Sequence, residues 1–136
     1  MSSELTNMNT LAEFQAPLDL VEVRHHPEKY PRIGATPFEE AAAKMRKLVL
    51  AAFLYRGQES TNDTITFVAA ALVKEIQADT QLGLRHLSWE EIGMVIRRAV
   101  LGAGKELFGV TVASLYGALA DYAKTEGHEA DKKKTL

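Results

Sequence analysis

The chain has 136 residues, of which 46% are hydrophobic and 25% charged, with no cysteine and a net charge of −2. This composition excludes a disulfide framework, thiolate metal sites and a cysteine nucleophile, and its acidic balance argues against a dedicated nucleic-acid module, which would more often be basic. The N-terminus lacks the basic start and apolar run of a secretory signal, and the longest apolar run, residues 48–55, is too short to span a bilayer. We therefore expect a cytoplasmic protein of one domain without a membrane partner.

Residues 1–34 predict an irregular N-terminal arm, because Pro17, Pro27 and Pro31 interrupt it. The stretch LDLVEVR at 18–24 has enough apolar residues for a short strand or an extended arm. The sequence leaves open whether this arm packs on the body of the protein or is mobile.

The first helix is predicted to begin at Thr36-Pro37-Phe38-Glu39 and to end before Gly57. Thr36 suits the N-cap, Pro37 the first helical position and Glu39 the third, which is the pattern of a capping box. Apolar residues then recur at helical spacing and predict the buried face: Phe38, Ala42, Met45, Leu48, Val49 and Phe53.

Residues 57–63 predict a loop, after which Asn62 or Asp63 would cap a second helix over about 63–79. The buried face of this helix is predicted to contain Ile65, Val68, Leu72, Val73 and Ile76.

Ser88-Trp89-Glu90-Glu91 predicts the start of a third helix, with Ser88 at the N-cap and Glu91 at N3 of a capping box. Gly102 fits the left-handed position just past its end. A last helix is expected from near Thr111 to about Thr125, ended by Gly127.

These elements predict a small all-α bundle of about four helices. We expect it to comprise the arm at 1–34, a helical domain at 35–126 and a mobile C-terminal tail at 127–136.

The stretch VLGAGKELFG at 100–109 has the glycines and lysine of a phosphate-binding loop. However, a P-loop follows a strand and places Ser or Thr after its lysine, whereas Glu106 stands there after a predicted helix. His25 and His26 have no further ligand at metal-binding spacing. The paired glutamates, 39–40 and 90–91, lie in first helical turns, where the helix dipole already explains them. We therefore expect no catalytic residue, metal site, cofactor or small-molecule ligand, and not an enzyme.

Basic residues form two groups that could contact nucleic acid or a partner, one along the first helix and one around the end of the third: Lys44, Arg46, Lys47 and Arg56, and Arg97, Arg98 and Lys105. Their alternative role is as solvated helix faces. Phe108, Tyr116 and Tyr122 are candidates for an exposed partner surface, with core packing as the alternative.

Residues 65–122 contain, in order, the stretches ITFVAAALVKEI, LSWEEIGMVIRRAVLG and KELFG, followed by a hydrophobic helix that closes on LADY. This order resembles small all-helical proteins of unknown function from Bacteroides-group prophages and mobile elements. This resemblance implies a non-enzymatic accessory or adaptor protein, related to DNA replication, that acts through protein contacts with at most weak nucleic-acid contact. The alternative is a homo-oligomeric structural or assembly protein of a phage.

Overall fold

The computed structural model describes residues 19–102 and 109–129. Its helices are α2 (Leu20–His25), α3 (Phe38–Arg56), α4 (Asn62–Ala78), α5 (Trp89–Val100) and α6 (Val112–Tyr122). Two short 3₁₀ turns, η1 (Ile33–Ala35) and η2 (Leu84–His86), connect them, and a π-helical segment, η3 (Ala123–Gly127), continues α6. The described residues contain no strand, which confirms the small all-α bundle.

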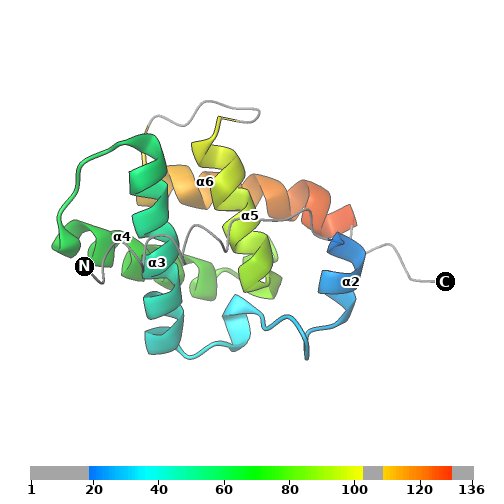
Figure 1. Ribbon diagram of the computed structural model, residues 1–136. Coiled ribbons are helices and arrows are strands. Elements are labelled where there is room, and N and C mark those ends of the chain that lie inside the picture. The colour runs from blue at the N-terminus through cyan, green and yellow to red at the C-terminus, as the bar shows by residue number, and fades with distance from the viewer. Residues whose placement is uncertain (1–18, 103–108, 130–136) are drawn as a thin grey trace.

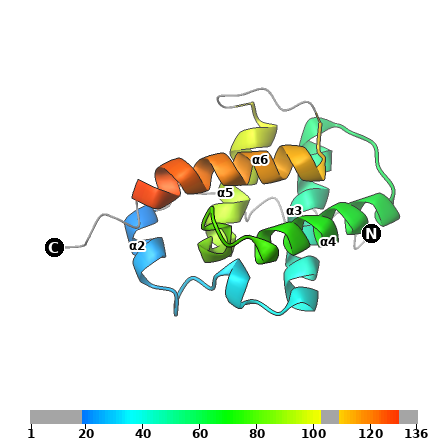
Figure 2. The ribbon, with the colours of Figure 1, turned by 180° about the vertical axis from the view of Figure 1, so that it is seen from behind.

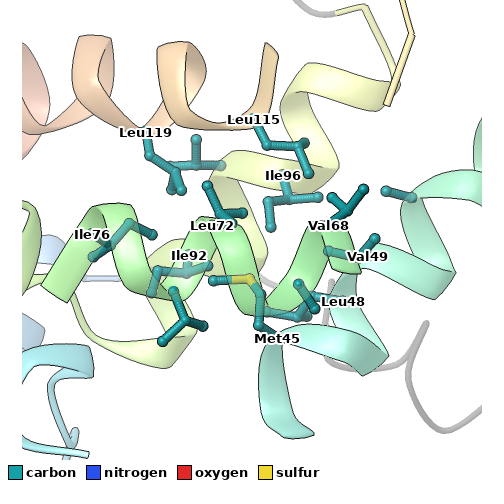
Figure 3. Packing of buried hydrophobic residues seen from close by; sticks show 14 of the residues in the cluster. Met45, Leu48, Val49, Val68, Leu72, Ile76, Ile92, Ile96, Leu115 and Leu119 are labelled. Atoms are coloured by element: carbon teal, nitrogen blue, oxygen red, sulfur yellow. The ribbon is translucent and has the colours of Figure 1, made fainter. Parts of the chain in front are cut away.

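The four longer helices form two crossed layers (Figures 1 and 2). Helices α3 and α5 lie side by side in one layer, and α4 and α6 lie across them in the other. The core between the layers takes side chains from all four helices (Figure 3): Met45, Leu48, Val49, Val68, Leu72, Ile76, Ile92, Ile96, Leu115 and Leu119. The helical spacing of apolar residues therefore predicted most of the core, except that on α3 Phe38 is 39% exposed and Ala42 is only partly buried.

The start of α3 differs from the predicted capping box. Helix α3 begins at Phe38, and its N-cap is Pro37, which has no side-chain hydrogen bond to offer. Thr36 is buried, and its hydroxyl donates to the carbonyl of Arg32 at 2.8 Å and accepts from the indole Nε1 of Trp89 at 3.1 Å. The reason is tertiary: the partly buried indole N–H needs an acceptor, and Thr36 is placed to supply it.

The other helix starts follow the sequence more closely. Thr61, one residue before the expected cap, accepts from the backbone N–H of Thr64 at the start of α4. Ser88 and Glu91 form the predicted capping box of α5. After α5, Gly102 adopts a φ of 74°, the left-handed conformation predicted for it.

Part of the predicted N-terminal arm is helical, because the LDLVEVR stretch forms α2 over Leu20–His25 instead of a strand or an extended segment, and residues 1–18 of the arm lie outside the described residues. Asp19 caps α2 by accepting from the backbone N–H of Glu22, and Val23 is 1% exposed. The chain then reaches the residues just before α5, where the backbone N–H of Ile33 donates to the carbonyl of Leu87 at 2.9 Å. The helical turn places Val23 on its inner side, so this segment packs on the body of the protein. Its short apolar pattern alone did not distinguish a helix from a strand.

The C-terminal boundary is also corrected. Gly127 does not end the last helix, because helical backbone continues through η3 to residue 129. Gly127 is buried against Tyr122, where a Cβ atom would stand 3.4 Å from the ring. The predicted mobile tail lies, from residue 130 on, outside the described residues.

Candidate functional site

An open groove of about 700 Å³ lies at the turn between α3 and α4. We call it the α3–α4 groove. Its apolar side chains come from the last turns of α3 and the first turn of α4, and its polar side is the connecting loop: Leu50, Phe53, Leu54, Gly57, Gln58, Glu59, Ser60, Thr61 and Ile65. The groove thus combines an apolar wall with a polar rim that includes one carboxylate.

The shape of the groove depends on how α3 ends. Gly57 has a φ of 64°, and its N–H donates to the carbonyl of Leu54, while the N–H of Gln58 donates to that of Phe53. This pair of bonds is the Schellman motif, which turns the chain away from the helix axis. The side-chain carbonyl of Gln58 then accepts from the backbone N–H of Val110 at 2.9 Å. The loop wall of the groove is therefore fixed both to α3 and to the residues that precede α6.

Two large apolar side chains stand exposed at this end of the molecule. Leu54, which lines the groove, is 47% exposed, and its neighbour Tyr55 is 42% exposed. Phe53, in the same groove, is buried and anchors the wall in the core. A groove with a fixed apolar floor and an exposed leucine at its edge can receive an apolar side chain from another molecule.

A second, smaller recess of about 300 Å³ lies between α3 and the start of α5. It is lined by Lys44, Lys47, Leu48, Trp89 and Glu90. The ammonium of Lys44 is 5.8 Å from the centre of the Trp89 ring, within the range of a cation–π contact. The structure therefore brings two of the predicted basic residues together beside an aromatic ring, with an acidic neighbour that partly offsets their charge.

The other predicted basic residues are directed elsewhere. Arg46 donates to Thr66 and Asn62 of α4, at 3.0 and 3.2 Å, so its guanidinium is used in joining two helices. Arg98 makes a 2.8 Å ion pair with Glu126 of η3. Neither guanidinium points to the recess that holds the two lysines.

The recess that holds Lys44 and Lys47 of α3 lies at the start of α5, far from the second predicted basic group at the end of that helix. Arg97 and Arg98 are in the last turn of α5. Trp89 is its first residue, about 12 Å away along the helix axis at 1.5 Å per residue. Arg56 is exposed at the end of α3, and Lys105 lies outside the described residues. The described basic residues therefore do not form one continuous patch.

The predicted aromatic partner surface is corrected for Tyr122. Its side chain is 4% exposed, and its hydroxyl donates to Oε2 of Glu91 at 2.5 Å. Burial, together with the negative charge of Glu91, raises the pKa of Tyr122 far above its usual range. Tyr116 is half-buried against the core, and Phe108 lies outside the described residues. Tyr122 therefore packs and bonds inside the protein instead of facing a partner.

Glu91 joins three helices in a buried polar network. Besides Tyr122 of α6, its carboxylate accepts from the backbone N–H of Ser88 at 3.0 Å and lies 3.7 Å from the guanidinium of Arg24 of α2. The Arg24 side chain is only 5% exposed and that of Glu91 is fully buried. Each oxygen of this carboxylate therefore has a partner that holds the fold together.

None of the helices in residues 19–102 and 109–129 has the length and apolar character needed to cross a membrane. Within the same ranges, no group of three or more acidic or histidine side chains is gathered closely enough to hold a metal ion. Comparison with protein-family models, with curated proteins and with solved structures found no match for this chain.

Sequence reasoning did not identify the α3–α4 groove, although a signal for it was present. The run LVLAAFLY at 48–55 is apolar on every side of a helix. Only one side of α3 can face the core, so some of these side chains must face outward. Leu54 and Tyr55 are the ones that do so.

Proposed function

We propose that this chain is a non-enzymatic adaptor that binds a partner protein in the α3–α4 groove. The observation that carries this proposal is the combination of a buried apolar wall, formed by Phe53 and Ile65, with the half-exposed Leu54 at its edge. An adaptor needs a preformed site that buries an apolar anchor, and such an anchor contributes most of the affinity of a protein contact. The partner segment carries a large apolar side chain next to a basic residue, which would face Glu59 on the rim.

The polar interior of the described residues supports a non-enzymatic role. Thr36, Ser88 and Glu91 are buried polar residues, and the Arg24 side chain is only 5% exposed. Each is used in hydrogen bonds or ion pairs between secondary-structure elements or at a helix cap. A catalytic acid or base instead needs access to a substrate. The distribution of basic side chains supports at most weak contact with nucleic acid, because Arg46 and Arg98 are bonded within the protein.

The biological setting in this proposal rests on the resemblance of residues 65–122 to small helical proteins of prophages and mobile elements. From it we infer an accessory role in DNA replication, and the composition of the chain favours the cytoplasm as its location. The sequence features that carry this resemblance are the LSWEEIGMVIRRAVLG stretch and its place between ITFVAAALVKEI and the apolar segment that closes on LADY.

A selection from a random peptide library displayed on phage tests the groove. The full chain serves as bait, and the library is first depleted on the Leu54→Lys variant. We expect enriched peptides that contain a large apolar residue beside Lys or Arg. Their binding, measured by fluorescence polarisation, should weaken at least about tenfold in Leu54→Lys, as expected for loss of an apolar anchor.

Leu101→Lys is the matched control, because Leu101 is 53% exposed at the end of α5 and does not line the groove. Its peptide affinity should equal that of the unmodified chain. Failure of the selection to enrich any sequence, or equal binding by both variants, would contradict the proposal.

A further inference from the structure

The outer face of α4 carries a second exposed apolar side chain, away from the α3–α4 groove. Phe67 is 69% exposed, the largest exposed fraction among the large apolar side chains of the described residues. The opposite face of α4 is in the core, where Ile65, Leu72 and Ile76 are at most 4% exposed. Figure 2 shows α4 at the surface of the molecule, next to α6.

Four residues at spacings of four, three and four form one stripe along this outer face: Asp63, Phe67, Ala70 and Lys74. Asp63 and Lys74 are exposed at its two ends, and Ala70 is partly exposed between them. Neither Asp63 nor Lys74 makes an ion pair with another described residue. The stripe therefore has a negative charge at one end and a positive charge at the other, with a large and then a small apolar side chain between them.

This order is complementary to itself in the antiparallel direction. The pairs 63/74 and 67/70 share one midpoint, between residues 68 and 69. When a second α4 packs antiparallel about that point, Asp63 faces Lys74 of the other copy and Phe67 faces Ala70. Each contact occurs twice, as a two-fold axis requires. In a parallel packing the like charges would instead face each other.

We propose that the protein forms a homodimer through this stripe, with two copies of α4 packed antiparallel. The large Phe67 ring fills the space over the small Ala70 of the other copy, and the two charge pairs fix the direction and register. None of the four stripe residues lines the α3–α4 groove, so the dimer contact and the groove use different side chains. An adaptor of this form presents two grooves, so it can hold two copies of a partner.

Sedimentation equilibrium of the full chain over a range of concentrations tests the dimer. Phe67→Lys should weaken dimerisation by about 30-fold or more, because it removes the central apolar contact. Asp63→Lys alone should weaken it about tenfold, since two attractive pairs become repulsive. The double variant Asp63→Lys/Lys74→Asp exchanges the charges and should restore the dimer to within about threefold of the unmodified chain.

The register has a separate test, because the chain has no cysteine of its own. A mixture of Phe67→Cys and Ala70→Cys chains should form disulfide-linked dimers more completely than either variant alone. Circular dichroism shows whether each variant keeps its fold. The exposed side chains of the stripe make loss of folding unexpected.

A chain that stays monomeric at every concentration would overturn the proposal, and the stripe would then be a candidate surface for a different protein. A dimer that persists in Phe67→Lys, or that the charge exchange fails to restore, would overturn it as well. The two proposals fail separately: Leu54→Lys should still dimerise, and Phe67→Lys should still bind the selected peptides.

Discussion

The phenol of Tyr122, on α6, donates a 2.5 Å hydrogen bond to the carboxylate of Glu91, on α5, in the interior of the protein. The same carboxylate accepts from the N-cap of its own helix and faces Arg24 of α2. A single buried glutamate therefore fixes the relative positions of three helices.

Tyr122→Phe should lower the free energy of unfolding by about 1–3 kcal/mol, because it leaves one oxygen of a buried carboxylate without its donor. Urea denaturation followed by circular dichroism measures the change. Tyr116→Phe is the matched control: Tyr116 is partly buried on the same helix, and we expect less than about 0.5 kcal/mol. Equal losses in the two variants would show that the bond to Glu91 contributes nothing particular.

Two Gly→Ala substitutions should have opposite effects. Gly57 has a φ of 64°, so alanine there should destabilise the protein by about 1 kcal/mol. Gly117 lies within α6 with open space where a Cβ would be, so alanine there should stabilise it by about 0.5–1 kcal/mol. Thermal melting of both variants checks the signs. A stabilising Gly57→Ala would contradict the left-handed end of α3.

The carboxylate of Asp79 should stabilise the folded protein at neutral pH, and this contribution should be lost at acid pH. Its burial raises the pKa, but hydrogen bonds from the backbone N–H groups of Leu82, Leu84 and Gln81 outweigh this and hold it below the usual value of 3.8. Because the pKa of Asp79 is lower in the folded protein than in the unfolded chain, the stabilisation is complete at pH values above the unfolded-state pKa. It is lost as the pH falls through the folded one.

Denaturation at neutral pH and near the folded pKa of Asp79 measures this effect. Asp79→Asn should reduce stability at neutral pH and lose less stability on acidification than the unmodified chain. Glu40→Gln, a change of an exposed carboxylate on α3, is the control and should keep the full acid sensitivity. An Asp79→Asn variant with unchanged acid sensitivity would show that other carboxylates dominate.

Lys44 and Lys47 should account for any contact of the described residues with nucleic acid. We expect weak, salt-sensitive binding of a labelled DNA duplex in fluorescence anisotropy, and the Lys44→Ala/Lys47→Ala variant should lower the slope of log K against log salt by about 2. Arg98→Ala should change it less, because Arg98 is paired with Glu126. A larger effect of Arg98→Ala would place the contact at the other end of α5.

The sequence alone determined the features of the protein that depend on neighbours along the chain. Apolar residues at a period of 3.6 predicted the core faces of four helices, and the Ser88–Glu91 capping box and the left-handed Gly102 followed from residue type and spacing. These features are local, because a helix bonds each backbone group to one only a few residues away.

Only the tertiary structure decided which polar and aromatic side chains met across the fold. Thr36 is not a helix cap because it accepts from Trp89, which is 53 residues distant. Tyr122 is buried because it lies over Glu91, and Arg46 is used in joining α3 to α4. The α3–α4 groove likewise depends on how two helices pack at their turn. Such contacts join residues that are distant in sequence, and no local spacing encodes which of them come together.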